Sequence, residues 1–145
     1  MNRRCLLFDA SSIFMLVREF REEAPEILRG GSTISLAYYE IGNALWRECV
    51  LLKRVTPEEA LGILRALFAM LRTMEVTKLE DEDGGVAILN LACELNITYC
   101  DAAYLAEAQR SGRMLVTDDE GLAEAAGRVG VKTVTSRVVG QAELE

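Results

Sequence analysis

The sequence contains no histidine among its 145 residues. This absence excludes triads that pair serine or cysteine with histidine, and it removes imidazole as an acid–base group. The four cysteines show no C-x-x-C spacing, which disfavours a zinc site, and we expect them to be buried thiols. The chemistry that remains open to the chain uses carboxylates, lysines and metals bound through oxygen.

Long apolar runs are also missing. No run approaches the roughly 20 residues that a membrane-spanning helix needs, and the basic start of the chain is followed by Asp9 rather than by a signal segment. We therefore predict a cytoplasmic protein that does not contact membranes. Half of the residues are hydrophobic, so we expect residues 1–145 to form one domain that buries about two-thirds of its unfolded surface.

Positive charge is scarce, because 16 lysines and arginines face 23 acids and the net charge is −7. This balance disfavours a protein that coats nucleic acid nonspecifically, which needs a basic surface. It does not exclude an enzyme that acts on nucleic acid. Carboxylates that hold divalent cations lower the formal charge, while the loaded site presents positive charge to a phosphate.

Two short apolar strands are predicted at residues 5–8 and 114–117. Acidic residues directly follow each strand, Asp9 the first and Asp118 and Asp119 the second. Strands and helices alternate along the chain, which predicts a three-layer α/β/α domain with a mostly parallel sheet. The carboxyl ends of parallel strands meet at one edge of a sheet, where ligands bind, so these acids should lie together. Further strands are expected at 33–35, 74–79 and 131–134. Helices are expected at 12–20, 36–53, 56–72, 80–95, 101–111 and 122–129, and another short helix is expected to begin near Pro25. The chain is expected to end in a polar tail.

The predicted helix at 56–72 has an unusually wide apolar surface. It begins with Thr56-Pro57-Glu58-Glu59, which supplies a capping residue, a proline at the first helical position and early acids. Its apolar residues extend well beyond the usual core-facing arc. Either the helix is buried in the core, or its second side is a dimer interface.

Two more acids, Glu40 and Asp101, occur where the sequence otherwise looks like packed core. Each acid taken alone has a structural explanation, because Asp101 can cap a helix, Glu40 can lie on a solvated face and Asp118 can start a turn. Partly buried carboxylates that converge would repel one another and take up protons unless a cation neutralised them. Mg²⁺ or Mn²⁺ suits such a cluster.

Four segments in this order resemble a known family. They are Leu-Phe-Asp-Ala-Ser at 7–11, Tyr-Tyr-Glu-Ile-Gly-Asn-Ala-Leu at 38–45, Tyr-Cys-Asp-Ala-Ala-Tyr-Leu-Ala-Glu-Ala at 99–108 and Leu-Val-Thr-Asp-Asp-Glu-Gly-Leu at 115–122. The chain is similar to PIN domains, particularly to the VapC-type ribonuclease toxins, from Leu6 to about Val134.

The resemblance implies a role for each matching residue. The catalytic, metal-binding acids would be Asp9, Glu40, Asp101 and Asp119. Asp118 falls at a variable position of the family and could contribute through water, because only one of two neighbouring strand side chains faces a site squarely. Residues at supporting positions around the acids are Ser11, Asn43 and Thr117. Arg47 would bind a phosphate of the substrate if it projects from the Glu40 face, and is otherwise a surface arginine.

The function implied by the resemblance is a Mg²⁺- or Mn²⁺-dependent endoribonuclease, the toxin of a toxin–antitoxin pair, acting as a homodimer and inhibited by a small antitoxin protein. One alternative is a catalytically silent PIN-fold module that acts through RNA or protein contacts. A second alternative is a receiver-like signalling domain. Such domains need an acidic pair near the first strand, whereas Asp9 stands alone.

Overall fold

The two apolar strands predicted from the sequence lie side by side at the centre of a five-stranded sheet. In the computed structural model, which describes residues 2–144, β1 (Leu6–Phe8) is parallel to β4 (Met114–Val116), and Phe8 pairs with Val116. The strand order is β3-β2-β1-β4-β5, and every neighbouring pair is parallel. The predicted α/β fold with a parallel sheet is confirmed.

The remaining strands are short. They are β2 (Ser32–Ile34), β3 (Glu75–Thr77) and β5 (Thr133–Val134). The α-helices are α1 (Ala10–Phe20), α2 (Ala24–Leu28), α3 (Leu36–Trp46), α4 (Pro57–Leu71), α5 (Glu82–Leu95), α6 (Tyr99–Ser111), α7 (Glu120–Arg128) and α8 (Ser136–Leu144).

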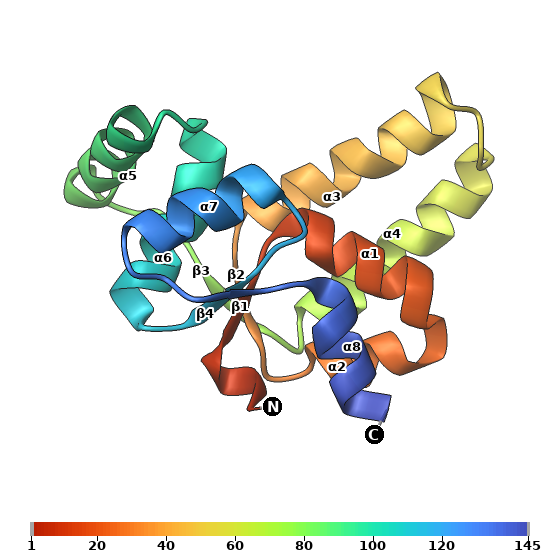
Figure 1. Cartoon of the computed structure of the whole chain (residues 1–145). Coiled ribbons are helices and arrows are strands. Elements are labelled where there is room, and N and C mark those ends of the chain that lie inside the picture. Colours follow the sequence, from red (N-terminus) through yellow and green to blue (C-terminus); the bar gives the residue numbers. More distant parts are fainter. Residues whose placement is uncertain (1, 145) are drawn as a thin grey trace.

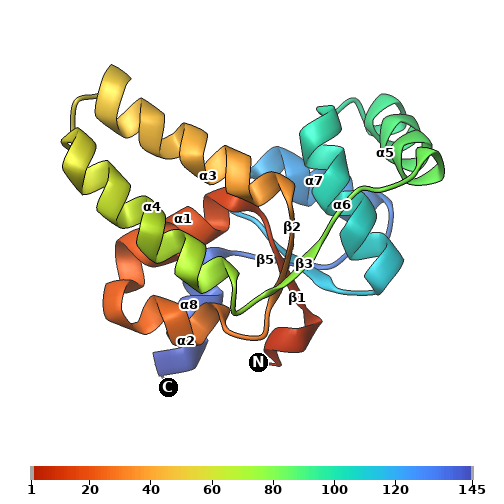
Figure 2. The ribbon, with the colours of Figure 1, turned by 180° about the vertical axis from the view of Figure 1, so that it is seen from behind.

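Helices cover both faces of the sheet. Figure 1 shows α5, α6 and α7 on one side, and α1, α2, α4 and α8 on the other. The reverse view in Figure 2 shows that α3 and α4 form a hairpin whose tip extends away from the sheet. None of the helices in residues 2–144 has the length and apolar character needed to cross a bilayer.

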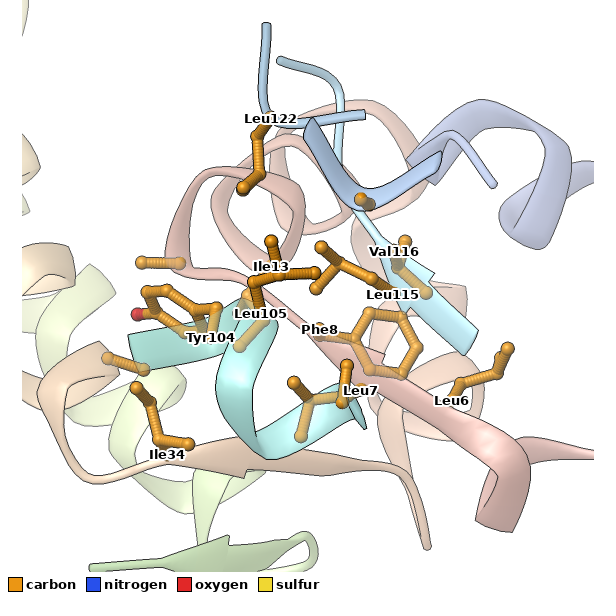
Figure 3. Close-up of a cluster of buried hydrophobic side chains, with 14 of the residues drawn as sticks. Leu6, Leu7, Phe8, Ile13, Ile34, Tyr104, Leu105, Leu115, Val116 and Leu122 are labelled. Atoms are coloured by element: carbon orange, nitrogen blue, oxygen red, sulfur yellow. The ribbon is translucent and has the colours of Figure 1, made fainter. Parts of the chain in front are cut away.

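The central strand β1 is buried along its whole length. Leu6, Leu7 and Phe8 are at most 1% exposed, and Figure 3 shows them in one cluster with Leu115 and Val116 of β4. A strand covered by helices on both faces has no solvent side, so its sequence is an unbroken apolar run. Burial of each such side chain contributes about 1.5–3 kcal/mol.

Several helix boundaries differ from the prediction, among them the start of α1 and the end of α3. The helix after β1 begins at Ala10 rather than Ser12, because Asp9 itself is the N-cap and its side chain accepts a hydrogen bond from the Ser12 amide. The long helix predicted at 36–53 is regular only to Trp46. It continues as a π-helical turn, Arg47–Leu51, with Leu52 as the C-cap, and Lys53 after it has a φ of +52°.

The predicted polar tail is wrong, because residues 136–144 form α8. Val139 is 2% exposed, and a Cβ on Gly140 would lie 2.3 Å from the ring of Phe20, so α8 packs closely on α1. The expectation of buried cysteines is also wrong, since Cys5, Cys93 and Cys100 are exposed.

The apolar helix α4 is only partly buried. It begins at Pro57, as predicted, and Thr56 and Glu59 form a capping box there. Leu67 and Leu71 are fully buried, whereas Leu61 is 51% exposed. Burial in the core therefore explains the apolar residues on one side of α4. A dimer interface stays a prediction for the other side.

The turn before β2 tolerates no added methyl group, and this can be tested at Gly31. A Cβ there would lie 2.6 Å from the ring of Phe8, which is fully buried and has no room to shift. We expect Gly31→Ala to lower the free energy of unfolding by about 1–3 kcal/mol. Gly62→Ala is the matched control, because its Cβ meets nothing within 4 Å in α4 and should raise stability by about 0.5–1 kcal/mol. Urea unfolding measures both, and equal effects would contradict the packing at Gly31.

Candidate active site

The candidate site lies at the carboxyl ends of β1 and β4, where the strand order reverses direction. Crevices at such points bind ligands in open parallel sheets. The Asp9 amide donates to the Val116 carbonyl (3.2 Å). The Ser12 hydroxyl reaches both the Asp9 carbonyl (2.9 Å) and the Val116 carbonyl (3.0 Å), and it thereby fastens the two strand ends together.

Asp9 is the most deeply buried of the candidate acids, at 6% exposed. Its Oδ1 accepts a hydrogen bond from the Ser12 amide (2.8 Å). Burial raises the pKa of the Asp9 carboxyl, the charge of Asp118 raises it further, and hydrogen bonds from Thr117 and Ser12 lower the pKa in part. Asp9 therefore carries its negative charge at a cost in free energy.

Glu40 is held by a partner that the sequence analysis did not single out. The Tyr104 hydroxyl donates to Glu40 Oε1 (2.7 Å). Burial raises the pKa of Glu40, and the charges of Asp101 and Asp9 add to the rise. Burial and Glu40 also raise the pKa of Tyr104, so its phenol stays a proton donor. Figure 3 shows the Tyr104 ring beside the aliphatic core, with its oxygen at the margin.

Asp101 lies in the first turn of α6, where it is half-buried. The helix begins two residues earlier than predicted, because Thr98 is the N-cap and its hydroxyl accepts from the Asp101 amide (3.1 Å). Burial raises the pKa of Asp101, and the charge of Asp119 raises it further. Asp101 thus couples to Glu40 on one side and to Asp119 on the other.

The two neighbouring acids after β4 have different partners. Asp119 is the N-cap of α7, with Oδ1 accepting from the Leu122 amide (3.1 Å), and its own amide donates to Thr117 Oγ1 (3.1 Å). Asp118 instead accepts from the Ser136 amide at Oδ1 (2.8 Å) and from the Ser136 hydroxyl at Oδ2 (2.6 Å). Both oxygens of Asp118 therefore anchor the start of α8.

The acids form a chain of mutual repulsion that suits a cation. Asp119 raises the pKa of Asp101, Asp101 and Asp9 raise that of Glu40, and Asp118 raises that of Asp9. Carboxylate oxygens are the donors that hard divalent cations prefer, so the donor set fits Mg²⁺ or Mn²⁺. Within residues 2–144, no three acid or thiol side chains already stand around one point as a metal cage. A shared ion would therefore need to draw the carboxylates together.

A groove of about 630 Å³ between α1 and α3 leads away from the acids. Its walls include Ser11, Glu40, Asn43 and Arg47. Ser11 is exposed in the groove, and the hydroxyl that bonds to the Asp9 backbone is that of Ser12. Asn43 and Arg47 are exposed one and two turns after Glu40, so the predicted phosphate-binding residue does face the groove.

A larger groove of about 990 Å³ lies between α5 and α6. None of the four predicted catalytic acids lines it, although Tyr99 and Cys100, directly before Asp101, do. The size of a groove does not indicate what it binds. We place the candidate site at the acids and at the smaller groove, which Glu40 lines.

The unfavourable charge on Asp9 makes a testable prediction about stability. Asn caps a helix as well as Asp does, so Asp9→Asn removes the charge and keeps the cap. Because folding raises the Asp9 pKa above 3.8, the wild-type carboxylate destabilises the fold at neutral pH and this penalty disappears as pH falls. In EDTA at pH 7, the variant should be more stable than the wild type, by on the order of 1 kcal/mol.

The advantage of Asp9→Asn should shrink as pH falls through the folded pKa and vanish below the unfolded value, 3.8. Urea unfolding at a series of pH values measures it. A variant that is equally stable or less stable at pH 7 would contradict the unfavourable burial of the charge.

The anchoring of α8 by Asp118 can be tested with a double-mutant cycle. Asp118→Ala should lower the free energy of unfolding by about 1–3 kcal/mol, because it leaves the amide and hydroxyl of the buried Ser136 without their partner. Ser136→Ala should cost less, about 0.5–1.5 kcal/mol, because the exposed Asp118 carboxylate can bond to water instead. The double variant should lose less than the sum, since the two residues share both hydrogen bonds. Strict additivity would mean that the pair does not interact in solution.

Comparison with known proteins places this geometry in a family. No protein-family model matches the chain. Exonuclease VapC9 of Pyrobaculum aerophilum is 33% identical over 138 residues, which cover 93% of this chain and 96% of that protein. Ribonuclease VapC3 of the same organism is 34% identical over 128 residues, covering 82% of this chain and 92% of that protein.

Solved structures agree with the sequence relatives. The crystal structure of PAE2754 from Pyrobaculum aerophilum matches with a TM-score of 0.74 and 29% identity, over 94% of each chain. The structure of FitAB bound to an IR36 DNA fragment matches with a TM-score of 0.60 and 13% identity, over 90% of this chain and 94% of that one, a likeness of fold alone. Since a third of its residues match VapC9 along nearly the full length of both proteins, this chain belongs to the VapC family of PIN-domain proteins.

Proposed function

We propose that this protein is a divalent-metal-dependent endoribonuclease. The observation that carries the proposal is the coupled acid cluster of Asp9, Glu40, Asp101 and Asp119 at the sheet edge, in a chain without histidine. The relatives support the reaction class, because one is named an exonuclease and the other a ribonuclease. We assign RNA as the substrate and internal phosphodiester bonds as the point of cleavage.

The four acids would hold one or two Mg²⁺ or Mn²⁺ ions. A bound ion would supply a water of lowered pKa and positive charge for the phosphate oxygens. Asp9 and Asp119 are fixed by the N-terminal amides of α1 and α7, and Tyr104 orients Glu40. These hydrogen bonds restrain the three carboxylates at the sheet edge, and an ion shared among them would draw their remaining oxygens together.

The groove supplies groups that can hold the RNA backbone. Arg47 is exposed on its α3 wall, and a guanidinium can form two parallel hydrogen bonds to a phosphate. The Asn43 amide lies one turn nearer to Glu40 and can bond to a ribose or a base. A phosphate placed between Arg47 and the acids would then be positioned for hydrolysis.

We further propose that the protein is the toxin of a toxin–antitoxin pair, a cytoplasmic homodimer that a small antitoxin protein inhibits. Its membership of the VapC family supports this biological role. The partly exposed side of α4, with Leu61 51% exposed, is the surface that we assign to the dimer.

The alternative of a silent binding module is disfavoured because all four acids are present and coupled. Calorimetry separates the two hypotheses. The enzyme should bind Mn²⁺ at millimolar concentration or below, with weaker binding in Asp9→Asn, whereas a silent module should bind RNA or protein and no divalent ion. The VapC relatives leave the receiver-like alternative without support.

The proposed activity is tested by cleavage of fluorescently labelled RNA with Mg²⁺ or Mn²⁺. Asp9→Asn and Asp101→Asn should each reduce the rate on the order of 100-fold or more, because each removes a charge that positions the reacting groups. EDTA should abolish cleavage in the wild type. Asp83→Asn is the control, since Asp83 is an exposed acid at the start of α5. Unchanged cleavage in both site variants would refute the assignment.

A further inference from the structure

Two consecutive tyrosines in α3 have opposite environments. The ring of Tyr38 packs edge-on against Phe68, with 4.9 Å between the ring centroids. Tyr39 is 79% exposed, the largest fraction of any large apolar side chain in the part of the chain that the structure describes. The fold accounts for the first tyrosine and leaves the second without a packing role.

Tyr39 lies beside the acids and in the groove. It directly precedes Glu40 and lines the same space between α1 and α3 as Ser11 and Asn43. Tyr39, Asn43 and Arg47 follow one another at intervals of four residues and all line this groove. Residues at this spacing share one face of a helix, about 6 Å apart along its axis. The wall thus presents an aromatic ring, an amide and a guanidinium in line.

The opposite wall offers no ring to cover Tyr39. Its aromatic residue, Phe14, already has the guanidinium of Arg18 over its face, 5.7 Å from the ring centroid. Arg18 in turn pairs with Glu48 (3.0 Å). Among Tyr39, Asn43 and Arg47, the cation is therefore Arg47 and the exposed ring is Tyr39.

We propose that Tyr39 is a stacking platform for an unpaired base of the RNA next to the cleaved phosphate. This inference rests on the proposed nuclease function. Every base has a π-face, so stacking on an aromatic side chain is strong and tolerant of sequence. A base inside a duplex has both faces covered by its neighbours, so only an unpaired base can be splayed onto the ring. The continuity of the groove with the acids selects nucleic acid as its occupant, because Glu40 belongs to both.

Binding is measured first, in the Asp9→Asn background with Mg²⁺, where RNA stays intact. The probes are a fluorescein-labelled single-stranded RNA, the same strand in a perfect duplex, and a series of strands that each carry one abasic position. We expect the protein to prefer the single strand, and Tyr39→Ala to weaken its binding on the order of ten-fold. Tyr39→Phe should retain most of the affinity, since the ring makes the contact.

The decisive result is a double-mutant cycle between the ring and a base. One abasic position should weaken binding to a protein with Tyr39, and this penalty should disappear in Tyr39→Ala. Leu89→Ala is the matched control, because Leu89 is 54% exposed on α5 and lies outside the groove. Its RNA binding should be unchanged.

Other outcomes overturn the inference. Equal binding of Tyr39→Ala and its parent, an abasic penalty that persists without the ring, or equal affinity for duplex and single strand would each exclude stacking. A change in oligomeric state by light scattering, without a change in RNA affinity per site, would assign Tyr39 to a protein contact instead. If the wild type cleaves RNA and Tyr39→Ala cleaves it equally well, the inference fails alone. If the wild type neither binds nor cleaves RNA, the proposed function fails with it.

Discussion

Repulsion among carboxylates at the edge of β1 and β4 is the constraint on which the arrangement of the site depends. Buried like charges lie together only when donors nearby stabilise the charged forms. Asp9 and Asp119 each cap a helix, and Asp101 lies in the first turn of a third. Three helices therefore point their positive ends at the acids, which offsets part of the repulsion. Burial, and to a smaller extent the charge of Asp118, still raises the pKa of Asp9, so the fold holds this carboxylate at a cost in stability.

The parts of the fold that depend on local pattern could be predicted from the sequence. The unbroken apolar runs at 5–8 and 114–117 predicted two strands of the sheet, because such runs occur where helices cover both faces of a sheet. Thr56-Pro57-Glu58-Glu59 marked the start of α4, since a capping residue, a proline at the first helical position and early acids can be read from consecutive residues. The sequence also placed Asp9 at the edge of the sheet, because the carboxyl ends of parallel strands all lie at the same edge. The choice of metal-binding acids rested on family resemblance and stays a prediction.

Features that depend on contacts across the chain could not be predicted in this way. Helix α8 was missed because its short amphipathic pattern is weak. The hydrogen bonds between Ser136 and Asp118, which anchor its start, form only once β4 and β5 have paired. Tyr104 has the spacing of an ordinary core residue in α6, and its role appears only when Glu40 arrives from α3. Ser12 was passed over in favour of Ser11, since two adjacent hydroxyls can be told apart only once the N-cap of α1 is known.

The bond from Ser12 to Val116 joins positions 104 residues apart in the sequence. A nascent chain has Asp9 and Glu40 well before it has β4 and Asp119. Contacts of such separation also form late in folding, because a long loop must close first. The four acids therefore come together only after β4 has been made and has paired with β1. A nascent chain that still lacks β4 carries only part of the candidate site.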